Sequence, residues 1–222
     1  MALGFTETSG ADFLPIIKFD ARAGRFFRVD RSQGSEGWTS NSVDITGVFS
    51  AVFDFANIEA GWAAFTDGRP SFVMAPIGGA FPAKPSDNHK QGFRLTVMLG
   101  KKAADGEAPV REMASTAMGV RRAIDALHDE YVAGLAGNPG KLPVVSCKET
   151  LPIESQTPAG KTLNYAPIFK IDKWVARPAD LADRATDNAP SPAQPPRTGD
   201  AAAVPPPKAA PVAEVVDDDD FG

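Results

Sequence analysis

Hydrophobic and polar positions alternate along much of the first hundred residues, and this alternation predicts β-strands. The longest example covers residues 43–55, where apolar side chains occupy most odd positions. A period of two places one side of a strand on a core, so the pattern predicts one long strand that bends near Gly47. Further strands are expected at 13–19, 24–31, 61–65, 70–77, 92–100, 142–151 and 163–175. The side chains that we assign to the core are Phe49, Phe53, Phe55 and Phe93.

One segment has the period of a helix. Apolar residues recur at steps of four and three from Met113 to Leu135, which predicts a single helix of about six turns with an apolar stripe. Gly134 and Gly137 are expected to end it, because glycine terminates helices. The stretches 32–41 and 78–91 are rich in Ser, Gly or Pro and are expected to be loops.

The order of these elements predicts a mainly β protein. Strands with one apolar face need a barrel or a sandwich to cover that face. A five-stranded Greek-key barrel of the OB type, with extra N-terminal strands and one helix between the third and fourth barrel strands, has the expected order. Another small β-barrel or sandwich with a decorating helix is the alternative.

The C-terminal part of the chain has a different composition. Residues 188–212 are rich in proline and alanine, and the chain ends with Asp217, Asp218, Asp219, Asp220, Phe221 and Gly222. Such a segment cannot bury enough apolar surface to fold, so we expect an extended linker. The predicted organisation is a folded domain over 1–178, a disordered linker over 179–214 and an acidic tip over 215–222.

The charge of the chain is unevenly distributed. The formal net charge is −5, and residues 187–222 contain seven acidic and two basic residues. The C-terminal part therefore carries the whole net charge, and the remainder is neutral with 21 acidic and 21 basic residues. A neutral domain can still carry a basic groove if its charges are segregated.

No catalytic constellation is recognisable in the sequence. The single Cys147 gives neither a disulfide framework nor a cysteine zinc site. The glycine-rich stretch 134–141 lacks the spacing and the Ser/Thr of a phosphate loop. We therefore expect a protein that is not an enzyme and has no cofactor or metal. No signal pattern and no membrane-spanning apolar run occurs, which favours a cytoplasmic location without membrane association.

Basic residues interleaved with aromatic ones are the most distinctive chemistry. Arginine and lysine neutralise phosphates, and flat rings stack on bases without regard to sequence. On a strand, one of Phe26 and Phe27 must face outward between the flanking arginines. The candidate phosphate contacts are Arg25, Arg28, Arg31, Arg94, Lys101 and Lys170. The candidate stacking residues are Phe26 or Phe27, Trp62 and Trp174.

The layout resembles single-stranded DNA-binding proteins of bacteria and, more closely, of tailed bacteriophages. The residues that carry the resemblance are Asp217 to Asp220 with Phe221, the proline/alanine linker, and the stretch 18–26. The resemblance implies an OB-fold that binds single-stranded DNA and an acidic tip that recruits replication and repair enzymes. The sequence departs from the bacterial pattern at the tip, where Asp220 precedes the ring and Gly222 follows it.

The resulting expectation is a non-catalytic protein that binds single-stranded DNA largely without sequence preference, in DNA replication, recombination or repair. Its location would be the host cytoplasm if a bacteriophage encodes it. The acidic tail would also compete with DNA for the basic groove. Two rivals remain open: a β-barrel protein–protein adaptor, and a structural phage component, neither binding nucleic acid. The sequence also leaves a homo-oligomer open.

Overall fold

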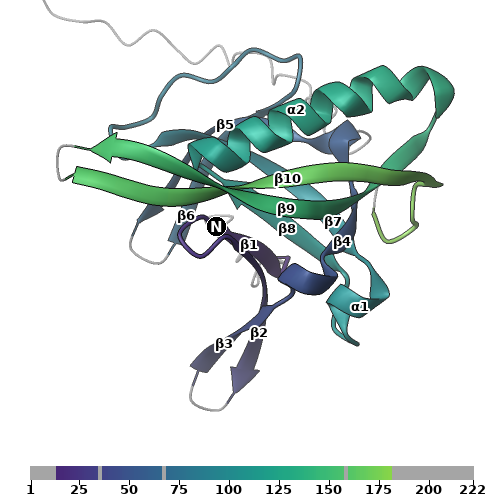
Figure 1. Cartoon of the computed structure of the whole chain (residues 1–222), viewed down its shortest axis with the longest axis horizontal. Coiled ribbons are helices and arrows are strands. Elements are labelled where there is room, and N and C mark those ends of the chain that lie inside the picture. The colour runs from purple at the N-terminus through teal and green to yellow at the C-terminus, as the bar shows by residue number, and fades with distance from the viewer. Residues whose placement is uncertain (1–13, 35–36, 67–68, 158–159, 182–222) are drawn as a thin grey trace, which may run out of the picture. The chain divides into compact units, whose positions relative to one another are not determined.

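A computed structural model describes residues 14–34, 37–66, 69–157 and 160–181. The fold is one large mixed sheet with two helices and several short 3-10 turns (Figure 1). The prediction of a mainly β protein is confirmed. The first three residues of the predicted linker, 179–181, are described, and Leu181 is buried there. The rest of the predicted linker and the acidic tip lie outside the described residues.

The strands are β1 (Ile16–Asp20), β2 (Arg25–Gly34), β3 (Gly37–Asp44), β4 (Ser50–Phe53), β5 (Glu59–Thr66), β6 (Arg69–Pro76), β7 (Lys90–Leu99), β8 (Val110–Ser115), β9 (Lys141–Thr157) and β10 (Gly160–Ala176). The helices are α1 (Lys101–Ala104) and α2 (Met118–Gly134), and the 3-10 turns are η1 (Thr46–Val48), η2 (Phe55–Asn57) and η3 (Leu135–Gly137). The strand order is β10-β9-β4-β7-β8-β1-β2-β3, and β5 pairs with both β6 and β7. All pairs are antiparallel except β1 with β8.

The prediction of one long strand over 43–55 is wrong. The β3 strand ends at Asp44, and the η1 turn separates it from β4. The Asp44 carboxylate accepts hydrogen bonds from the Thr46 backbone N–H at 2.9 Å and the Thr46 hydroxyl at 2.6 Å. Such a local side-chain bond offers the backbone an alternative to the sheet, so the strand stops there.

Two other boundaries also differ from expectation. The predicted helix over 113–135 begins only at Met118, because Met113 lies on the inner side of β8 and is buried there. The apolar positions at the end of β8 and those of α2 happen to continue one helical spacing, so the sequence pattern joined the two elements. The predicted loop over 32–41 is mostly strand, since β2 and β3 form a hairpin that projects from the body (Figure 1).

The core lies between the curved sheet and α2. Phe49, Phe53, Phe55 and Phe93 are buried, which confirms their assignment to the core. The Phe49 ring stacks on Phe26 with a centroid distance of 4.1 Å. The apolar stripe of α2 is confirmed in its helical part, where Val120, Ile124, Leu127 and Tyr131 are buried.

The edge strand β10 approaches the turn between β1 and β2 without closing the sheet. The turn between β1 and β2 meets β10 through one hydrogen bond, from the Tyr165 N–H to the Ala21 carbonyl at 2.6 Å. Gly24 has a φ of +67°, and a Cβ there would lie 2.9 Å from the Tyr165 ring. A glycine is therefore required for this close approach.

Among the described residues, no helix is both long and apolar enough to cross a membrane.

Candidate nucleic-acid interface

The strand register sorts the candidate residues onto two sides of the sheet. Residues paired in register have side chains on the same side, and successive residues alternate. Phe26 pairs with Phe19 and faces the aromatic core, whereas Phe27 pairs with Lys18 and faces away from it. We call the side away from the core the outer face. By alternation, Arg25 and Arg31 share the outer face with Phe27.

The outer face continues across β1 and β8 to β7. Glu112 of β8 pairs with Ile16, the outer-face neighbour of Lys18 on β1, and with Thr96 of β7. Arg94 alternates with the buried Leu95 and therefore also lies on the outer face.

Lys170 of β10 reaches the outer face through β9 and β4. It pairs with Ser146, and Ser146 pairs with Ser50, which lies on the opposite side of β4 from the buried Ala51. Intervening strands separate β2, β7 and β10, so these cations share a face of the sheet but do not form one groove.

The most developed site on the outer face is an aromatic patch on β5, β6 and β7, formed by Phe65, Phe72, Lys90 and Arg94. The rings of Phe65 and Phe72 meet edge to face at 5.8 Å. The Arg94 guanidinium lies over the Phe72 ring at 5.6 Å from its centroid. Phe65 is 55% exposed, and Lys90 is exposed on the same side of β7.

Sequence reasoning placed Phe65 and Phe72 in strands but not in the site. The hairpin register pairs Phe65 with Pro70 and Ala63 with Phe72, which makes the two rings diagonal neighbours. The available signal was the spacing of the two phenylalanines on either side of the sequence Thr66-Asp67-Gly68. Large side chains at diagonal positions of a hairpin can touch.

Three candidate residues make packing contacts within the fold, and two of them, Phe26 and Arg28, are buried. Phe26 is 0% exposed, so it cannot offer its ring to a base. Trp174 stacks on Tyr131 of α2 at 5.6 Å and covers Gly134, where a Cβ would lie 2.4 Å from the indole. Arg28 is buried and donates from Nη1 to the carbonyls of Ala103, at 3.1 Å, and Ala104. Burial therefore corrects Phe26 and Arg28 to packing roles, whereas Trp174 is half-buried and its contact with DNA stays a prediction.

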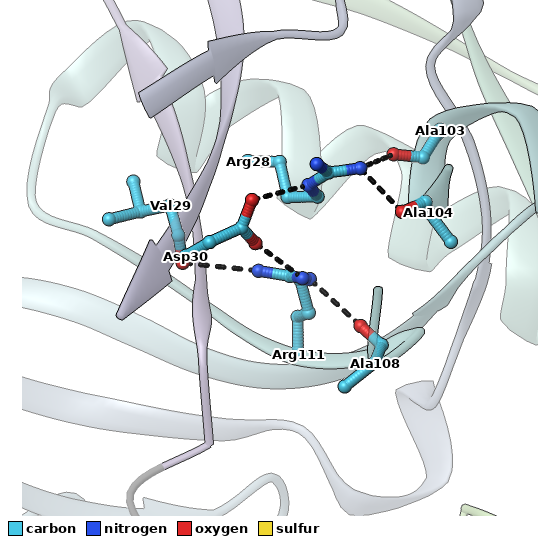
Figure 2. Close-up of polar contacts among 7 residues, drawn as sticks. All are labelled: Arg28, Val29, Asp30, Ala103, Ala104, Ala108 and Arg111. Carbon is cyan, nitrogen blue, oxygen red and sulfur yellow. Dashed lines mark hydrogen bonds and ion pairs between the residues drawn. The ribbon is translucent and has the colours of Figure 1, made fainter. Parts of the chain in front are cut away.

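Arg28 belongs to a buried charge cluster with Asp30 and Arg111 (Figure 2). The Asp30 carboxylate accepts from Arg28 Nε at 2.9 Å and forms an ion pair with Arg111 Nη2 at 2.7 Å. Arg111 also donates to the carbonyls of Val29 and Ala108, both at 3.1 Å. The cluster therefore joins β2 and β8 to the C-terminal end of α1, which is why a guanidinium is needed at position 28.

Three of the remaining cations already have acidic partners. Arg25 pairs with Asp44, and Lys170 pairs with Asp172 at 3.3 Å. Arg94 donates to Glu59 at 2.7 Å and lies 3.9 Å from Glu112. Arg31 and Lys101 are exposed on β2 and α1.

These carboxylates have a clear consequence for an incoming phosphate. At Arg25, Arg94 and Lys170 the phosphate must compete with the carboxylate that each cation already contacts. Any nucleic-acid affinity should therefore be lower than the number of cations on this face implies, and it should fall as salt is added.

Trp62 lies on the inner side of β5, away from the aromatic patch. Its indole Nε1 donates to the Pro82 carbonyl at 2.8 Å, and its ring meets Phe81 at 5.9 Å. The ammonium of Lys84 lies 5.8 Å from the indole centroid. The two faces of the β5–β6 hairpin thus each carry aromatic rings beside a cation.

The environment of Cys147 is not that of an activated nucleophile. Burial raises the pKa of the Cys147 thiol, which is the opposite of the shift that activates a nucleophilic cysteine. No group of three or more metal-binding side chains occurs in the part of the chain that the structure describes. The acidic tip residues Asp217 to Asp220 and Phe221 lie outside that part.

Asp44 gives a pH-dependent prediction. Hydrogen bonds from the Thr46 hydroxyl and N–H, together with Arg25, lower the pKa of Asp44 from 3.8 to about 2. A carboxyl with a depressed folded-state pKa stabilises the fold above its unfolded value and loses that contribution as the pH falls through the folded value. Asp44→Asn should therefore be less stable than the wild type at neutral pH, and the gap should narrow toward about pH 2.

Thermal unfolding of the wild type and Asp44→Asn at a series of pH values measures this gap. If the difference in stability between the two proteins is the same at neutral and at acid pH, the ionised Asp44 carboxylate does not stabilise the fold through these contacts.

Comparison with known proteins found no match: no family model, no curated protein and no solved structure is similar to this chain.

Proposed function

We propose that this is a non-catalytic protein that binds single-stranded DNA largely without sequence preference. The observation that carries the proposal is the aromatic patch of the outer face, where Phe65 and Phe72 lie beside Arg94 and Lys90. Rings on which bases stack, next to cations that contact phosphates, are the two components of sequence-tolerant single-strand binding.

The connectivity supports an OB-type barrel as the scaffold. Taking β4 with β5 as a bent first strand, the order β7, β8, α2, β9, β10 is that of an OB-fold with its helix between the third and fourth strands. The pairs β4–β7, β7–β8, β4–β9 and β9–β10 fit this order. In this interpretation β1 fills the gap between β8 and β10, since it pairs with β8 and the turn after it bonds to Tyr165.

The expected binding mode follows from the chemistry of the outer face. Bases stack on Phe65 and Phe72, and phosphates contact Arg94 and Lys90. Phe27, between Arg25 and Arg31 on β2, offers a further stacking position on the same face. Lys101 and Lys170 lie farther from the aromatic patch and add to the positive electrostatic potential that attracts DNA.

Binding of fluorescein-labelled oligo-dT, followed by anisotropy at low salt, tests the proposal. The wild type should bind and should release the oligonucleotide as salt is added. Phe65→Ala/Phe72→Ala should weaken binding at least about tenfold, because each stacked base contributes about 1–3 kcal/mol. The matched control is Leu151→Ala/Leu163→Ala, which removes two exposed apolar side chains from the β9–β10 hairpin and should leave the affinity unchanged.

The outcomes separate the parts of the proposal. If the wild type does not bind at low salt, single-stranded DNA is not the ligand. If the wild type binds and the double phenylalanine variant binds equally well, the aromatic patch is not the site.

The acidic tip is part of the same proposal. Four aspartates and Phe221 would recruit replication or repair enzymes, and their charge would compete with DNA phosphates for the basic groups. Deleting residues 217–222 should therefore tighten oligo-dT binding at low salt. Equal affinity of the full-length and shortened chains would remove this competition from the proposal.

A further inference from the structure

A pocket of about 400 Å³ lies between the N-terminal half of α2 and the inner side of β5 and β7. Phe81 and Met118 form its rim and are 52% and 49% exposed. The polar groups of the lining come from β7, which supplies Gln91, and from α2, which supplies Arg121, Arg122 and His128. The lining carries two arginines and one aspartate, Asp125, so its formal charge is positive with a neutral histidine.

Arg121 is incompletely satisfied in this pocket. Its Nη1 donates to the Gln91 side-chain oxygen at 3.2 Å. Its Nε is buried and has no hydrogen-bond partner among the described residues. Buried donors are rarely left without an acceptor, so this guanidinium is suited to an acceptor supplied by a ligand.

The pocket is continuous with the cation–aromatic groups around Trp62. The Phe81 ring on its rim contacts Trp62, and Lys84 lies over the indole. Trp62 belongs to the same hairpin whose other face carries Phe65 and Phe72. The β6 strand pairs only with β5, so among the described strands it is the free edge between these two faces.

We propose that this pocket binds one nucleotide of the same single-stranded DNA, with its base against Phe81 and Met118 and its phosphate at Arg121 and Arg122. The strand then runs from the aromatic patch around the edge of β6 into the pocket. This inference rests on the proposed DNA binding. A nucleic-acid strand fits because it repeats a flat ring and an anion at every unit, as rings and cations repeat along this path.

The test compares oligo-dT of two lengths, because only a longer strand can contact both faces. A single OB domain covers about 4–16 nucleotides, so suitable lengths are roughly 5 and roughly 16. The exposed rim variant Phe81→Ala/Arg122→Ala should bind the short oligonucleotide like the wild type. It should bind the long one at least about fivefold more weakly, as expected for one lost stacking contact. The control Val132→Ala/Lys141→Ala removes one exposed apolar and one exposed basic group from α2 and the start of β9 and should change neither affinity.

A second measurement locates the strand directly. Long oligonucleotides carrying 5-bromodeoxyuridine should cross-link on irradiation to the segment containing Phe81 or Met118, whereas short ones should cross-link mainly to the β5–β6 hairpin.

Each result has one meaning. If the wild type binds neither length, the proposed function fails. If the wild type binds both and the rim variant binds the long oligonucleotide normally, only the pocket assignment fails.

A synthetic acidic peptide with one aromatic residue is the third ligand. If its binding is lost in the rim variant while DNA binding is retained, the pocket binds a protein partner and the inference is overturned.

Discussion

Asp30→Ala is expected to lower the free energy of unfolding by about 3–5 kcal/mol, the usual effect of removing one partner from a buried ion pair. Asp30 is the carboxylate between Arg28 and Arg111, whose side chains are 6% and 1% exposed. Without it, two buried guanidinium groups face each other across the junction of β2, β8 and α1 (Figure 2). Their carbonyl contacts remain but carry no compensating charge.

Urea unfolding followed by tryptophan fluorescence measures this effect. The matched control is Asp172→Ala, which removes an exposed carboxylate paired with Lys170 and should change stability by no more than about 1 kcal/mol. A small domain has only about 5–15 kcal/mol of stability, so Asp30→Ala could be largely unfolded without urea. Asp30→Asn keeps an acceptor and should lie between the two. Equal effects of Asp30→Ala and Asp172→Ala would show that the cluster does not stabilise the fold.

The same cluster shows why the sequence misassigned Arg28. The stretch Arg25 to Arg31 is rich in arginine and aromatic residues, which is the composition of a phosphate-binding strand. Alternation alone places Arg28 and Asp30 on one side, two residues apart, but does not say that this side is buried. Their role depends on Arg111, 82 residues from Val29, in a strand whose second half the sequence pattern assigned to a helix.

Elements with a sustained and simple period were predictable. The strand β7 and the hairpin β9–β10 lie where alternation or apolar runs placed them, because each has one side on the core. The failures lie where a local interaction outweighs the pattern. Asp44 ends β3 by bonding to Thr46, although the alternation continues through it. Met113 fits a helical spacing by chance, since both the strand and the helix bury an apolar residue at that point.

The candidate site was predictable in composition but not in arrangement. Arg25, Phe27, Arg31 and Arg94 reach one face only through the parallel pairing of β1 with β8, a non-local contact with no signature in either segment. Phe65 and Phe72 needed the exact hairpin register to become neighbours. Phe26 faces the core and Phe27 faces away from it, and a one-residue slip in strand register would exchange the two positions.

Phe26→Ala and Phe65→Ala both shorten a strand phenylalanine to alanine, but the first should mainly lower stability and the second should mainly weaken DNA binding. Phe26 is 0% exposed and stacks on Phe49, so its loss leaves a core cavity and should lower the free energy of unfolding by about 3–5 kcal/mol. Phe65 is 55% exposed, and its loss should change stability by less than about 1 kcal/mol. Urea unfolding of the two variants gives both values.

The two substitutions should reverse their order in DNA binding. Phe65→Ala should weaken oligo-dT binding at least about fivefold, since one stacking surface is lost. Phe26→Ala should bind with wild-type affinity once the titration is corrected for the folded fraction. Weaker binding by the folded Phe26→Ala protein, with Phe65→Ala unaffected, would mean that DNA uses the face bearing Phe26 after a rearrangement of the sheet. The expected pattern instead gives the two rings separate roles: Phe26 packs in the core, and Phe65 is exposed and can stack on a base.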